Sequence, residues 1–171
     1  MSDNLRRYRA ICHALTQAYP TPPTGHFARH VQTLAALISG IVGGKSTQLP
    51  HIATKVSDGS KPESRVKRFA RWLDNERILE EMYFLPYAES LLTHLALETL
   101  VLVMDGRVVG RGCAALMIHV LYKGRALPLA WRVRQGPKGH FPEALHIAVV
   151  ELISEVIPGA RSQGTIRVTC E

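Results

Sequence analysis

The stretch Glu98 to His140, ETLVLVMDGRVVGRGCAALMIHVLYKGRALPLAWRVRQGPKGH, decides the fold class of this chain. It begins with an uncharged apolar run, Thr99 to Met104, which is typical of a strand buried on both faces. The run ends on Asp105-Gly106, an acid followed by a turn residue, so we expect the strand to end there. Two further runs with strand character follow, Cys113 to Tyr122 and Ala126 to Arg134. The stretch therefore predicts three consecutive strands of an α/β fold.

The same stretch is strongly basic. From Arg107 to Lys138 it holds seven Lys or Arg residues and no Asp or Glu. An acid at the end of a central strand, surrounded by cations, is the arrangement that metal-assisted chemistry on a phosphodiester requires. Asp105 is accordingly the candidate catalytic and metal-binding residue.

Composition points to a polyanionic partner. The chain has 171 residues, 46% of them hydrophobic, with 21 basic against 14 acidic residues, and its sequence pI is near 9.7. This surplus favours nucleic acid as a partner, although a merely basic soluble protein is also compatible with it. Three dispersed cysteines without a CxxC pair favour neither a disulfide framework nor a zinc site, and suit a reducing cytoplasm. We expect no targeting segment and no membrane span.

Apolar periodicity predicts a helical N-terminal half. The expected helices are Asp3 to Ala18, Thr24 to Val42, Gln48 to Lys55, Ser64 to Asn75 and Arg77 to Ala96. The GGKST sequence at residues 43–47 lacks the preceding strand and the glycine spacing of a phosphate-binding P-loop, and is interpreted as a helix end and a turn. A last helix is expected after Pro142, over the sheet.

The Ser64 to Asn75 segment is the candidate DNA-binding helix. Lys67, Arg68, Arg71 and Asn75 fall on the face opposite the apolar residues, and Arg65 falls between the two faces. In a helix-turn-helix-like module such cations meet phosphates or guanine edges, and the asparagine meets adenine. An ordinary surface helix with solvated charges is the alternative.

Two histidines and a turn complete the candidates in the second half. The Lys138-Gly139-His140 turn precedes a helix start, where a phosphate binds well, although such a turn is more often a simple cap. His119 is interpreted as a residue of the core or the sheet face, and no spacing predicts zinc. A hydrolase that uses Asp105 with His119 or His140 is a further alternative, but no nucleophile motif accompanies them.

Several motifs resemble a known family. They are Asp105-Gly106, Val109-Gly110-Arg111-Gly112, the run Tyr122-Lys123-Gly124-Arg125-Ala126-Leu127-Pro128-Leu129-Ala130-Trp131, and Lys138-Gly139-His140-Phe141-Pro142. Together they resemble the start of the catalytic domain of bacterial insertion-sequence transposases of the DDE class, which have a ribonuclease-H-like core. Lys45-Ser46 through Leu49-Pro50 and Ile52-Ala53, with Arg65 to Asn75, resembles the helical DNA-binding region of that family. The resemblance covers about residues 25–160.

The resemblance implies a fold and an activity. The fold class would be α/β: a helical DNA-binding module (1–96), the first half of a ribonuclease-H-like domain (97–160) with three antiparallel strands and a covering helix, and a tail outside the family (161–171). The resemblance also implies an order of elements that begins with an antiparallel meander, followed by a helix and a further strand. The activity would be transposition of double-stranded DNA by cleavage and transfer at the element's terminal repeats, in the bacterial cytoplasm with the nucleoid. Self-association is left open. The DNA-contacting residues expected are Lys45, Arg65, Lys67, Arg68, Arg71, Asn75, Arg107, Arg111, Lys123, Arg125, Lys138 and His140.

The sequence departs from the family pattern in its acids. Asp105 would be the first of three carboxylates that hold two Mg²⁺ or Mn²⁺ ions. After Pro158-Gly159-Ala160 the chain reads RSQGTIRVTCE, without the second Asp or the third acid, and Glu171 is supported as a substitute only by its charge. We therefore expect a truncated, inactive transposase with an unpaired edge on its first strand. The alternative is a non-catalytic DNA-binding remnant or regulator of transposition.

Overall fold

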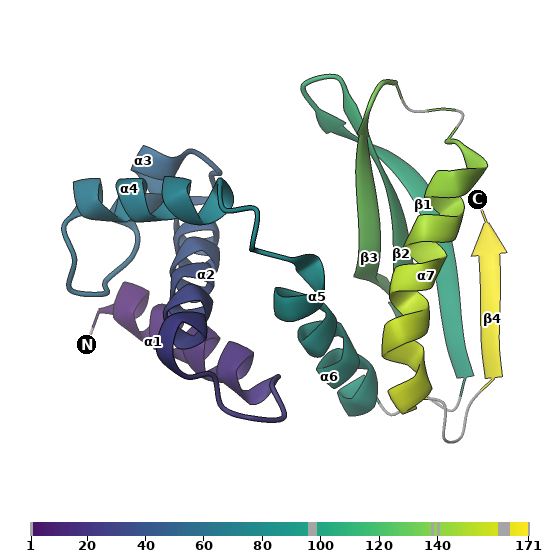
Figure 1. Ribbon diagram of the computed structural model, residues 1–171, viewed down its shortest axis with the longest axis horizontal. Helices are drawn as coiled ribbons and strands as arrows, with labels where there is room; N and C mark the ends of the chain where they lie inside the picture. Colours follow the sequence, from purple (N-terminus) through teal and green to yellow (C-terminus); the bar gives the residue numbers. More distant parts are fainter. Residues whose placement is uncertain (1, 96–98, 138, 140, 161–164, 171) are drawn as a thin grey trace. The chain divides into compact units, whose positions relative to one another are not determined.

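The computed structural model describes residues 2–95, 99–137, 139, 141–160 and 165–170 of the chain (Figure 1). The chain divides into two compact units, Met1–Tyr87 and Ala88–Glu171. The second unit thus begins nine residues before the predicted start of the second domain, residue 97. Each unit is described by itself below. No helix in the described ranges is long and apolar enough to cross a lipid bilayer.

The first unit is helical, as the sequence predicts. Its helices are α1 (Asp3–Gln17), α2 (Gly25–Gly44), α3 (Leu49–Thr54), α4 (Pro62–Leu73) and α5 (Glu80–Tyr83). The Ser2 hydroxyl accepts a hydrogen bond from the Leu5 N–H at 3.4 Å and caps α1. Pro62 opens α4, where its missing N–H costs no helical hydrogen bond. Helices α1 to α4 therefore lie close to their predicted bounds.

Two apolar clusters hold the helices together, and α2 contributes to both. The first cluster comprises Ala36, Leu37, Ile52, Ala53, Val56 and Phe69. The second comprises Leu15, Val31, Ala35 and Tyr83. Phe69 of α4 is fully buried, so α4 is fixed to α2 and α3 by its apolar face. The opposite face of α4 is thereby directed outward.

The glycine pair at the end of α2 has a packing role. Arg7 of α1 donates hydrogen bonds to the Ser39 carbonyl at 3.0 Å and the Lys55 carbonyl at 3.1 Å. Its guanidinium lies where a side chain at Gly43 would be, so a larger residue there would require the Arg7 side chain to move. Arg7 thus joins α1 to the ends of α2 and α3. This contact explains the glycine at position 43, which in the GGKST sequence could otherwise suggest a P-loop.

The predicted single helix from Arg77 to Ala96 is wrong. The chain forms α5, ending at Tyr83, and a separate helix α6 (Leu85–Leu95). Pro86 is the second residue of α6 and has no N–H to continue the preceding turn. The apolar periodicity is continuous across this point, and the proline breaks the backbone hydrogen bonding.

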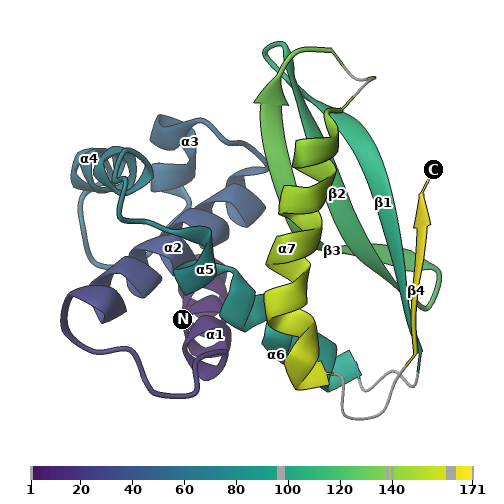
Figure 2. The same ribbon diagram turned by 45° about the vertical axis from the view of Figure 1, so that its right-hand side comes forward.

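The second unit holds a four-stranded sheet with one helix on it. Its strands are β1 (Thr99–Gly110), β2 (Cys113–Tyr122), β3 (Arg125–Gln135) and β4 (Thr165–Cys170), in the order β3-β2-β1-β4. β1, β2 and β3 form an antiparallel meander, and β4 pairs with β1 in parallel. Helix α7 (Glu143–Ala160) lies along one face of the sheet, as both views show (Figures 1 and 2). The α/β class and the three antiparallel strands are confirmed.

The predicted turn at Asp105-Gly106 is wrong. β1 continues to Gly110, and Asp105 pairs with Met117 inside the ladder. Gly106 has a different purpose: a Cβ on it would lie 2.5 Å from the Phe141 ring. The glycine therefore admits an aromatic ring against the strand.

The fourth strand corrects two further predictions. Residues 165–170, which the sequence analysis places in a tail outside the family and in no sheet, form β4. β4 pairs with β1 from Thr99 to Met104, so this part of β1 has no open edge. A six-residue run gives a weak local signal, and its pairing with a strand more than sixty residues away is a tertiary effect.

Candidate nucleic-acid interface

The outward face of α4 carries exposed cations. Lys67 and Arg71 are exposed, while Phe69 is buried. Arg71 Nε donates to the Lys67 carbonyl at 3.3 Å, so its side chain lies along the helix surface. The face combines positive charge with a backbone fixed by core packing, which is what a helix that contacts phosphates needs.

Arg65 is a correction to the predicted contact residues. Its side chain is 8% exposed and forms an ion pair with Asp58 at 2.7 Å. It also donates to the Ala53 carbonyl at 2.8 Å. Arg65 therefore joins α4 to α3 and the connecting loop from inside the unit. The helical projection placed Arg65 between the two faces of α4. It could not show that Arg65 has a partner, because Asp58 lies outside the helix.

Asp58 is the residue that sequence reasoning missed. Its carboxylate, 5% exposed, accepts from Arg65 and Arg68 and from the Ser60 N–H at 3.1 Å. Burial by itself would raise its pKa, but these hydrogen bonds and the charge of Arg68 hold the pKa of Asp58 well below its usual range. The available signal was the Asp-Gly-Ser sequence, which favours a side-chain-capped turn.

Arg68 and Asn75 are each engaged within the unit. The Arg68 side chain is 34% exposed and is held by Asp58. Asn75 lies beyond the end of α4, and its Oδ1 accepts from the Arg77 N–H at 3.1 Å. An asparagine needs both its oxygen and its nitrogen to bind adenine in two places. Lys67 and Arg71 are therefore the residues of α4 best placed for an external anion.

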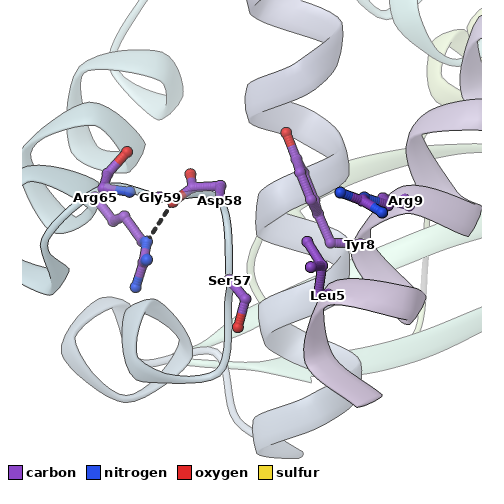
Figure 3. A pocket seen from close by; sticks show the side chains of 8 residues that line it. Leu5, Tyr8, Arg9, Ser57, Asp58, Gly59 and Arg65 are labelled. Atoms are coloured by element: carbon purple, nitrogen blue, oxygen red, sulfur yellow. Dashed lines mark hydrogen bonds and ion pairs between the residues drawn. The ribbon is translucent and has the colours of Figure 1, made fainter. Parts of the chain in front are cut away.

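A hollow of about 650 Å³ lies beside Asp58, between α1 and the loop before α4 (Figure 3). Tyr8 of α1 is on one side, and Asp58 and Arg65 are on the other. Burial and a hydrogen bond with Cys12 raise the pKa of Tyr8, so its hydroxyl stays protonated at neutral pH. A protonated phenol and a carboxylate held in ion pairs are both poor bases, so we assign this hollow no catalytic role.

The remaining predicted cations are dispersed. Lys45 is exposed at the end of α2, with φ of 49°. Arg107 and Arg111 are exposed at the end of the sheet where β1 turns into β2. Lys123 and Arg125 are exposed at the other end of β2. Lys138 and His140 lie outside the described residues. The structure thus places Arg107 and Arg111 at one end of β2, and Lys123 and Arg125 at the other.

Asp105 lies half-buried in the middle of β1. Because side chains alternate along a strand, it points to the face opposite that of buried Met104. Its lateral neighbours are Met117 on β2 and then Trp131 on β3. His119, named in the hydrolase alternative, is half-buried and pairs with Val103.

The described residues do not fit a two-metal site. Within the described part of the chain, no group of three or more His, Cys, Asp or Glu residues could hold a metal ion. Cys170, the last described residue of β4, pairs with Met104. Glu171, the next acid in the sequence, lies outside the described residues. Asp105 by itself supplies too few oxygen ligands for two divalent ions.

The chain matches none of the protein-family models, curated proteins or solved structures with which it was compared.

Proposed function

We propose that this chain binds duplex DNA through its helical unit, in the manner of the DNA-binding region of a DDE transposase, and performs no strand cleavage by itself. The observation that carries the proposal is the exposed pair Lys67 and Arg71 on α4, whose opposite face is locked into the core by Phe69. A basic surplus of seven charges supports a polyanionic partner.

The topology of the second unit supports the transposase relationship. The resemblance implies an antiparallel meander followed by a helix and a further strand, and the described strands and α7 have this order. Asp105 lies on β1, which has β2 and β4 as neighbours. A mixed sheet of this order also suits other α/β proteins, so the topology supports the proposal without carrying it.

The absence of cleavage is proposed on chemical grounds. In-line attack on a phosphodiester by this class of enzyme needs two divalent ions about 4 Å apart. Three carboxylates hold such a pair, and the described residues offer Asp105 without two companions. We therefore assign the chain DNA binding, with a role as remnant or regulator of transposition, and assign it no chemistry of its own.

The test compares two double variants with the same loss of charge. Lys67→Ala with Arg71→Ala removes the outward cations of α4, and Arg6→Ala with Arg29→Ala removes two exposed cations from α1 and α2. Fluorescence anisotropy with a labelled duplex at about 100 mM salt should show at least about tenfold weaker binding for the α4 variant. The α1 and α2 variant should bind within about threefold of the wild type. Equal affinities for both variants would assign α4 to an ordinary solvated surface.

A further inference from the structure

The outward face of α4 carries an acid beside its two cations. The helix begins at Pro62, so Glu63 lies in its first turn, before the segment in which the sequence analysis expects DNA contacts. Glu63, Lys67 and Arg71 follow one another at intervals of four residues, so they lie within about 80° of one another around the helix. All three are exposed, and Phe69 is buried on the far side. They therefore form one exposed row along α4.

The Glu63 carboxylate is not used to neutralise its neighbour in this row. Lys67 lies one turn further on, at a spacing where glutamate and lysine pair on a helix surface. Glu63 nevertheless takes part in none of the ion pairs that the described residues form. Its position in the first turn suits the helix dipole, but that interaction does not occupy the carboxylate oxygens. These oxygens are therefore available to an external hydrogen-bond donor.

The chemistry of duplex DNA limits what that donor is. A phosphate repels a carboxylate, so a duplex that contacts the row must offer Glu63 a different group. The row from Glu63 to Arg71 is about 12 Å long, which is about the width of the major groove. In that groove the N4 amino group of cytosine donates to glutamate, and residues near the N-terminus of a recognition helix are those that contact base edges.

We propose that Glu63 reads a cytosine in the major groove, by accepting a hydrogen bond from the N4 amino group of the base. DNA binding by α4 then depends on sequence. The inference rests on the proposed function and deepens it. Lys67 and Arg71 attract the phosphates of any duplex, and Glu63 selects the base.

The experiment compares the sites that the full chain and two variants select from a library of random duplexes. Glu63→Gln replaces the carboxylate by an amide, which binds adenine in two places. Asp74→Asn, the matched control, removes the same charge from an exposed residue just beyond the other end of α4. Both side chains are exposed, so circular dichroism should show both variants folded.

The expected result is a change of base at one position. The wild type should enrich a cytosine there, Glu63→Gln should enrich an adenine at the same position, and Asp74→Asn should select the wild-type site. Fluorescence anisotropy at about 100 mM salt, with duplexes that differ at this position, should show that the wild type and Glu63→Gln each prefer their own base by about fivefold or more.

The contrary outcomes are distinguishable. If the wild-type chain binds no duplex, both this inference and the proposed function are overturned. If it binds duplex but enriches no sequence, or if Glu63→Gln selects the wild-type base at every position, base reading by Glu63 is overturned and the proposed function stands. If Glu63→Gln and Asp74→Asn change the selected site in the same way, the change follows net charge, and the assignment to Glu63 is overturned.

Discussion

At the scale of residues, Asp58 holds the connection between α3 and α4. Its buried carboxylate is the partner of two arginines, one of which is buried as deeply as itself. Removing it would leave the Arg65 charge inside the unit with the Ala53 carbonyl as its hydrogen-bond acceptor. An uncompensated buried charge costs far more than the ion pair contributes.

Asp58→Ala should therefore lower the free energy of unfolding by about 3–5 kcal/mol. Denaturant unfolding followed by circular dichroism measures this. Asp3→Asn is the control, because its ion pair with Arg6 is exposed at both partners and should contribute less than about 1 kcal/mol. Similar losses in the two variants would show that Asp58 is not needed as a buried counter-ion.

The same residue predicts a dependence on pH. Because the pKa of Asp58 is held below its usual range, its stabilising contribution is complete above about pH 4, the value for an unfolded chain. It is lost as the pH falls below that value toward the folded-state pKa. The stability difference between wild type and Asp58→Asn should be constant from pH 8 to about pH 5 and should shrink in more acidic buffer. A difference that changes near pH 7 would require another titrating group.

Gly106 gives a second test at the residue scale. Gly106→Ala puts a Cβ 2.5 Å from the Phe141 ring, so the ring or the strand must move. We expect a loss of about 1 kcal/mol in the free energy of unfolding. In a Phe141→Ala background the same substitution should cost less, because the obstructing ring is gone, and a double-mutant cycle measures this coupling. If the effects of the two substitutions were additive, the Phe141 ring would not lie against Gly106.

At the scale of elements, local patterns in the sequence predicted most of the helices and the meander. Helices α1 to α4 and strands β2 and β3 follow from apolar periodicity and turn residues, which are local properties. β1 was predicted too short because Asp105-Gly106 has the composition of a turn. Only the distant Phe141 shows why a glycine lies within the strand.

The candidate DNA-contacting residues of α4 were harder to predict than the fold. The cations of α4 were identified, but which of them are free to bind depends on Asp58, ten residues before Arg68. A helical projection shows one helix without the segments that pack against it, so it could not show that Arg65 is buried. β4 was missed as a sheet member for a similar reason, since the strand with which it pairs, β1, lies far away in the sequence.

The pairing of β4 predicts a pattern of hydrogen exchange along β1. Residues Leu102 to Met104 have a strand on both sides, so successive amides there should be protected whichever neighbour they face. From Val108 to Gly110 the described neighbour is β2, so amides directed away from it should exchange quickly. Fast exchange of the amides from Leu102 to Met104 that face β4 would mean that β4 is not paired in solution.

At the scale of the whole molecule, the two units divide the proposed work. The helical unit presents Lys67 and Arg71, and the sheet unit carries the exposed Arg107 and Arg111. Neither surface includes Asp105, which lies inside the ladder. DNA binding is therefore expected to survive Asp105→Ala, because that substitution removes no cation.

Magnesium should not turn this binding into cleavage. Supercoiled plasmid incubated with the chain and Mg²⁺ or Mn²⁺ should stay intact, because Asp105 lacks companion carboxylates among the described residues. Agarose gels resolve nicked from supercoiled plasmid. Reproducible nicking that disappears in Asp105→Ala would overturn this prediction, and would mean that further acids complete the site.

The most direct test of the central claim is the salt dependence of duplex binding by the wild-type chain. If the exposed cations of α4 and of the rest of the chain release counter-ions from DNA, a plot of log affinity against log salt should fall linearly. With about three to five phosphate contacts, the affinity should drop roughly a hundredfold between about 50 and 200 mM salt. An affinity that stays level over this range, or no measurable binding at about 50 mM salt, would contradict the account.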